Sequence, residues 1–98
     1  MNALRIEWDE NKNRANRHKH GISFEEAETV FADDHALLVA DPDHSDDEDR
    51  FILLSMSLSL RIMVICHYYR VQDDAIRIIS ARKATSVEQN GYIKGWRI

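Results

Sequence analysis

The sequence has one cysteine, one proline and no long hydrophobic run. A lone Cys66 cannot form an intramolecular disulfide, so we expect a buried structural thiol and, weakly, a reducing cytoplasm. No apolar stretch is long enough for a transmembrane helix, and the charged residues soon after Met1 argue against a signal peptide. The 98 residues, 44% of them hydrophobic, predict a single domain over residues 1–98 with one modest core.

Motifs of common metal and catalytic sites are also missing. The chain has no Gly-rich phosphate loop, no Gly-x-Ser-x-Gly elbow, no His-x-x-x-His and no cysteine pair. His18 and His20 are two residues apart, so on a helix they point in different directions. The acid-rich stretch 41–48 lacks the glycine and the spacing of an EF-hand loop. We therefore expect no metal and no cofactor.

Charge is distributed unevenly along the chain. The formal net charge is −4, yet residues 33–49 hold eight acids and no lysine or arginine, while the rest holds 13 bases and 9 acids. This asymmetry allows an anionic partner on one surface and a cationic partner on another. Because clustered acids repel phosphate groups, we expect 41–49 to lie away from a bound anionic partner and to be available to a basic one. The alternative is a loop that only aids solubility.

The N-terminal third predicts a strand over 4–8 and then a helix. Asp9 is a good N-cap, and the helix should run to about Lys19 before Gly21 stops it. Its only apolar residue between 9 and 20 is Ala15, so we expect it to be loosely attached or to face a partner. A solvated surface helix is the alternative.

A second helix is predicted by the capping box of Ser23 and Glu26, and it should end near Asp33. Strands are then expected at 36–40, 50–56, 61–70 and 75–82, and short links between the last three predict an antiparallel meander. A further capping box, Thr85 with Glu88, begins a last helix. The predicted fold is α+β, with N-terminal helices packed on an antiparallel β-sheet and a short C-terminal helix.

The run 76–84 combines β-branched residues with cations. Arg77 lies inside it, and Arg82 and Lys83 close it. Guanidinium groups are seldom buried without a partner, so this strand should present arginines from a rigid sheet to a phosphate or a carboxylate. An arginine paired with a core carboxylate, or one on a solvated strand face, remains open.

Pairing the last two strands about the turn at 72–73 places Tyr68 roughly opposite Arg77. Opposed residues share a face, and so do alternate residues of one strand, so Tyr68, Arg70 and Arg77 should converge. A slip of one residue would reverse the faces. Such a group suits phosphate binding, base stacking and transition-state charge stabilisation, and a Tyr–Arg pair on a wet face is the alternative.

Several segments together resemble the BrnT-type toxins. Lys-His-Gly-Ile-Ser-Phe and Arg-Ile-Ile-Ser-Ala-Arg, in this order, are the most specific, and the resemblance runs from Trp8 to about Tyr92. The matching stretches are 8–12, Asn16, 19–27, 48–51, 76–84 and Glu88. Family members usually carry a glycine after the Glu-x-Arg-Phe strand, where this chain has Ser55 and Met56.

This resemblance implies a ribonuclease toxin of a type II toxin–antitoxin pair. It implies a RelE-like fold and metal-independent cleavage of mRNA that arrests translation. It also implies a cytoplasmic antitoxin with a ribbon-helix-helix DNA-binding domain. The pair is expected to form a heterotetramer that represses its own promoter, so that DNA is bound only through the antitoxin and no membrane is involved.

Metal-free cleavage needs a base for the 2′-hydroxyl, cations for the phosphorane and an acid for the 5′-oxygen. His20 is the best acid/base candidate because imidazole titrates near neutrality, although a histidine that only caps its helix is the alternative. Arg77 and Arg82 are the expected phosphate clamps. Lys19, Arg50 and Tyr68 are the supporting candidates. The rival function is a non-catalytic protein-binding module that acts through its polar helix and acidic loop.

Overall fold

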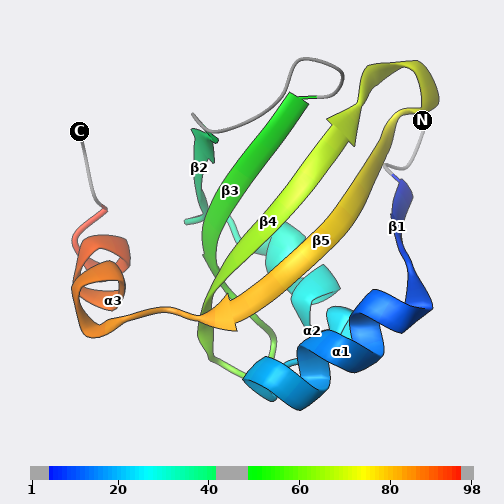
Figure 1. The fold of residues 1–98 in the computed structure, drawn as a ribbon. Coiled ribbons are helices and arrows are strands. Elements are labelled where there is room, and N and C mark those ends of the chain that lie inside the picture. Colours follow the sequence, from blue (N-terminus) through cyan, green and yellow to red (C-terminus); the bar gives the residue numbers. More distant parts are fainter. Residues whose placement is uncertain (1–4, 42–48, 96–98) are drawn as a thin grey trace.

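The computed structural model describes residues 5–41 and 49–95, so Leu4 of the predicted first strand and residues 42–48 of the predicted acidic loop lie outside it. The described residues form a twisted sheet with helices around it (Figure 1). The elements are β1 (Arg5–Trp8), α1 (Glu10–His20), α2 (Phe24–Glu28), η1 (Thr29–Ala32), β2 (Leu37–Ala40), β3 (Asp49–Met56), β4 (Ile62–Arg70), η2 (Val71–Asp73), β5 (Ala75–Lys83) and α3 (Ser86–Ile93). Within the described residues, no helix is long and apolar enough to cross a membrane.

The sheet has five strands in the order β1-β5-β4-β3-β2. The predicted antiparallel meander of β3, β4 and β5 is confirmed, and β2 extends it. The prediction of a wholly antiparallel sheet is wrong, because β1 pairs parallel with β5, with Ile6 opposite Ile76. A parallel pair needs a long connection, and the chain from the end of β1 to the start of β5 provides it.

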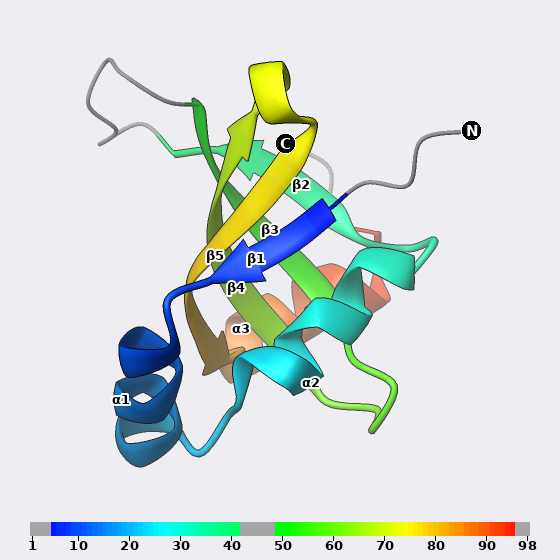
Figure 2. The same cartoon turned by 90° about the vertical axis from the view of Figure 1, so that its right-hand side faces the viewer.

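The two faces of the sheet differ in what covers them. On one face, here the covered face, α2 and η1 bury the main core. That core is Ile22, Phe24, Ala27, Val30, Leu53, Met63, Ile65, Ile78 and Ala81. On the other, here the open face, Leu54 and Val64 pack with Ala84 and Tyr92 near α3. Figure 1 shows α2 behind the sheet and α3 at one end of it, and in the turned view of Figure 2 α2 lies to one side of the sheet. Most of the open face therefore stays uncovered by helices.

Two buried asparagines attach the polar helix α1, Asn16 to the sheet and Asn13 to α2. The Asn16 side chain donates to the Ala81 carbonyl at 2.8 Å and accepts from the Ala81 N–H at 3.1 Å. Its amide therefore substitutes for a neighbouring strand where β1 no longer covers β5. The Asn13 Oδ1 accepts from the Phe24 N–H at 2.8 Å. The prediction of a loosely attached helix is wrong, because buried hydrogen bonds replace the missing apolar stripe.

The link between β3 and β4, residues 57–61, is hydrogen-bonded to α2. Glu26 accepts from the Ser57 hydroxyl at 2.9 Å, from Ser59, and from the Arg61 Nε at 2.8 Å. The hydrogen bond with Arg61 is the main reason that the pKa of Glu26 falls to about 2. Leu60 takes a left-handed φ of 64° in this turn.

The second α-helix is shorter than predicted. The second helix was expected to reach Asp33, but α2 ends at Glu28 and continues as the 3₁₀ turn η1 to Ala32. Ser55 lies in the region where the resemblance to BrnT-type toxins implies a glycine. It is fully buried and donates its hydroxyl to the Val30 carbonyl at 2.8 Å. The hairpin therefore forms without that glycine.

Candidate functional site

Arg77 and Arg82 are five residues apart on one strand, so simple alternation would put them on opposite faces. The structure puts both on the open face because β5 contains a bulge. Cys66 of β4 pairs with Ser80, but the next residue, His67, pairs with Ile78, which leaves Ile79 unpaired. This extra residue shifts the alternation of side chains beyond it, so that Arg82 lies on the same face as Arg77.

A row of side chains crosses the open face in register. Arg50 of β3 lies opposite Tyr68 of β4, and Tyr68 lies opposite Arg77 of β5. This confirms the predicted pairing of Tyr68 with Arg77. Arg70 is two residues beyond Tyr68 and shares its face. The four arginines of the described strands β3, β4 and β5 thus all point to the open face.

Two arginines of this face are held by carboxylates near the ends of the strands. The Arg50 Nε lies 2.8 Å from the Asp41 carboxylate, and hydrogen bonds with Tyr68 and then Asp41 raise the pKa of Arg50. Arg70 lies 2.9 Å from Asp73 and 3.4 Å from Glu7. Arg50 therefore fixes the position of Tyr68 more than it offers a free charge.

Arg82 is also paired, in a way that orients it. Its two terminal nitrogens each donate to one Glu88 oxygen at 2.9 Å. Glu88 also accepts from the Thr85 N–H as part of the capping box of α3, and the Arg82 hydrogen bonds lower the pKa of Glu88 to about 2. A guanidinium has five N–H donors, so donors remain for a phosphate.

Arg77 differs from the other arginines of the open face. Within residues 5–41 and 49–95 its side chain makes no hydrogen bond and no ion pair, and it is half-buried. The alternative of an arginine paired with a core carboxylate therefore does not apply to the described residues. A positioned cation without a protein partner is what an anionic ligand needs.

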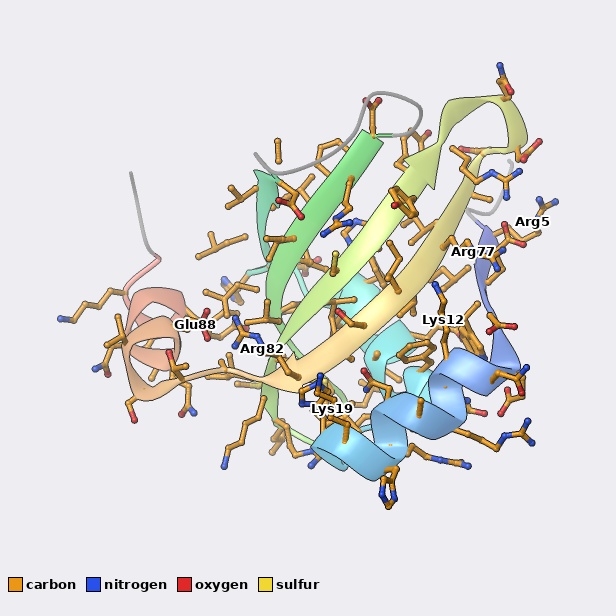
Figure 3. All side chains as sticks on the ribbon, viewed as in Figure 1. Arg5, Lys12, Lys19, Arg77, Arg82 and Glu88 are labelled. Carbon is orange, nitrogen blue, oxygen red and sulfur yellow. The ribbon has the colours of Figure 1, made fainter. Side chains whose placement is uncertain are left out.

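Helix α1 adds lysines along the border of this face. Lys12 and Lys19 are seven residues apart, so they lie on the same side of the helix. In Figure 3 both lie on the part of α1 next to β5, Lys12 toward Arg77 and Lys19 toward Arg82. Sequence reasoning selected Lys19 but missed Lys12. The seven-residue spacing was the signal that could have identified it.

His20 is the exposed last residue of α1. The cap of the helix is made by the Gly21 backbone, whose N–H donates to the Arg17 carbonyl at 2.8 Å with φ of 69°. In the described part of the chain the His20 side chain forms no hydrogen bond, which argues against the capping alternative. His20 is about 12 Å along the helix from Lys12, so it belongs to the Lys19 end.

The candidate residues thus form two groups on one face. Arg50, Tyr68 and Arg77 make the upper group with Lys12. The lower group is Lys19 and Arg82, and His20 follows Lys19 at the end of α1. The open-face Cys66 lies between them in the sheet. It is half-buried, not buried as expected, and burial raises the pKa of its thiol, which disfavours the thiolate. No group of three His, Cys, Asp or Glu that could hold a metal occurs among the described residues.

Comparison with known proteins identifies the family of the chain. Residues 8–88 match the family described as the ribonuclease toxin BrnT of type II toxin–antitoxin systems. A crystal structure of the Brucella abortus ribonuclease toxin BrnT matches with a TM-score of 0.62 and 26% sequence identity, over 86% of this chain and 100% of that one. No curated protein matches. The family match covers most of the chain, including Lys12, Lys19, Arg77 and Arg82, and the chain therefore belongs to the BrnT toxin family.

Proposed function

We propose that this protein is a toxin that cleaves mRNA without a metal ion, by attack of the RNA 2′-hydroxyl on the neighbouring phosphate, and so inhibits translation. The family match supports the ribonuclease class. The main support for the site is the state of Arg77. It is a half-buried cation without a partner among the described residues, and it lies opposite Tyr68 on the open face.

The two groups suggest a division of roles. The arginines Arg77 and Arg82 bind phosphates, Lys19 adds charge next to Arg82, and His20 transfers protons. Tyr68, held by Arg50, stacks against a base. Arg77 and Arg82 are roughly 15 Å apart along β5, so a single RNA strand lying along β5 passes both groups.

The antitoxin implied by the family name is the second part of the proposal. We propose a ribbon-helix-helix antitoxin that forms a heterotetramer with the toxin in the cytoplasm and binds DNA on behalf of the pair. We also propose that the mixed sheet with its N-terminal helices is a variant of the RelE-like arrangement.

An RNA cleavage assay with purified protein in excess EDTA tests the enzyme. We expect the wild type to cleave, and a double variant, His20→Ala with Arg77→Ala, to be inactive. Arg14→Ala is the matched control, because Arg14 is an exposed cation on the side of α1 away from Lys12 and Lys19. A wild type that binds RNA but never cleaves it would favour the non-catalytic binding module.

His20 can be tested separately by His20→Gln. Because Gln keeps hydrogen-bonding capacity but cannot transfer a proton, we expect the cleavage rate to fall by about 10²-fold. The pH–rate profile of wild type and variant is the measurement. If the variant keeps both rate and profile, another residue supplies the acid or the base.

A further inference from the structure

The edge strand β2 is unusually apolar for an edge. The exposed fraction of Leu38 is 59% and that of Val39 is 43%, although the two side chains point to opposite faces. Asp41 donates its N–H to the Arg50 carbonyl, so by antiparallel alternation Leu38 and Ala40 direct their backbone groups outward, away from β3. Edges of this kind, without a lysine or a proline in the strand, pair readily with another chain.

A hollow of about 340 Å³ lies beside β2 on the covered face, beyond the region that α2 fills. Phe31, Phe51, Tyr69 and Ile76 line it, and Leu38 contributes to its wall. His67 also lines it, and burial lowers the pKa of that imidazole, so it is neutral at pH 7. The hollow has room for a large apolar side chain.

Three of the described carboxylates lie around this region. Asp49 shares a face with Phe51 and lies opposite Tyr69, Asp74 accepts from the Tyr69 hydroxyl at 3.2 Å, and Asp34 is exposed just before β2. The arginines of β3, β4 and β5, in contrast, all lie on the open face. The sheet therefore separates a cationic face from an apolar hollow with an acidic border.

We propose that the β2 edge and this hollow are the docking surface for the antitoxin, whose bound segment adds a strand to β2, places one apolar side chain in the hollow and carries net positive charge nearby. The partner class rests on the proposed function. Main-chain pairing with one side-chain pocket is a common way to bind an extended peptide. The acidic border selects a basic segment.

Charge also argues against a second copy of this chain as the occupant. Two β2 strands paired antiparallel about a two-fold axis would bring the Asp34 end of one copy toward the Asp49 end of the other. Like charges placed this way oppose association. A basic partner has no such penalty.

The test uses purified full-length toxin and the purified protein encoded beside its gene. Leu38→Asp should weaken binding at least tenfold and leave RNA cleavage in the absence of the partner unchanged. Leu58→Asp is the matched control, because Leu58 is 79% exposed in the β3–β4 link, and it should change neither quantity. Ala40→Pro removes one outward N–H and should also weaken binding while the thermal melt shows a folded protein.

Each outcome has a defined meaning. Wild-type affinity in both Leu38→Asp and Ala40→Pro would overturn the docking surface while leaving the ribonuclease assignment intact. A wild-type dimer that Leu38→Asp converts to a monomer, measured by sedimentation, would make a second copy the occupant. Failure of the neighbouring protein to bind wild-type toxin would also overturn the inference. Absence of RNA cleavage in the wild type would instead count against the proposed function, since the binding measurements do not depend on it.

Discussion

Arg77 is the residue on which the proposed RNA contact depends most. We expect Arg77→Ala and Arg77→Lys both to reduce RNA cleavage strongly, because lysine is a point charge and cannot reproduce the planar, bidentate fork of a guanidinium. Both variants should keep the wild-type melting temperature, since no ion pair of Arg77 is lost in the described structure.

Cleavage assays beside thermal melts separate the two roles of this arginine. A broken buried ion pair would cost about 3–5 kcal/mol, which a melt would show plainly. Full activity in Arg77→Lys would contradict the phosphate-clamp role. Arg14→Ala again controls for loss of one positive charge.

Local sequence signals identified some of these residues and not others. The caps Asp9, Ser23 and Thr85 could be predicted because a cap bonds to a backbone N–H three residues away. The Asn16–Ala81 pair joins residues 65 positions apart, and no local pattern encodes such a contact. The bulge at Ile79 also had no signal, because no glycine marks it.

At the scale of elements, the attachment of α1 depends on Asn16. We expect Asn16→Ala to lower the free energy of unfolding by about 2–3 kcal/mol, because it leaves the buried N–H and C=O of Ala81 without partners. Urea unfolding measures this. Asn11→Ala is the control, since Asn11 is exposed on the same helix and should cost less than about 0.5 kcal/mol. Equal losses in the two variants would show that α1 is held by other contacts.

In the β3–β4 link, by contrast, one substitution should raise the free energy of unfolding. Leu60 adopts φ of 64°, which costs a non-glycine residue about 1–2 kcal/mol, and its side chain is 77% exposed. Leu60→Gly should therefore stabilise the protein by about 0.5–1 kcal/mol after the entropy of glycine is counted. A melting temperature at or below that of the wild type would contradict this.

At the scale of the whole molecule, carboxylates join the helices to the sheet. Glu26 ties α2 to Arg61, Glu88 ties α3 to Arg82, and both have a folded pKa of about 2 against an ordinary 4.5. Asp33 accepts hydrogen bonds from Tyr92 and from the Met56 N–H, and these outweigh its burial, so its pKa is lowered too. All three act as attachment points between layers.

These shifts determine how stability depends on pH. A carboxyl group with a depressed pKa stabilises the fold above pH 4.5 and loses that contribution as the pH falls toward 2. Because the arginine partners are partly exposed, each ion pair contributes about 1 kcal/mol. Urea unfolding of Glu26→Gln combined with Glu88→Gln should therefore show a weaker dependence on pH between 5 and 2.5 than the wild type. Glu28→Gln, an exposed change on α2, should follow the wild-type curve.

The unpaired Ile79 has a consequence for how this chain can change in evolution. Because of this extra residue, Arg77 and Arg82 share a face only at their present spacing along the strand. Loss of one residue there, or gain of one, would turn one of the two arginines to the covered face and remove it from the proposed RNA site. Substitutions at Ile79 can be tolerated, but single-residue insertions and deletions in this strand cannot, so relatives that use both arginines should keep the five-residue spacing even where their sequences differ.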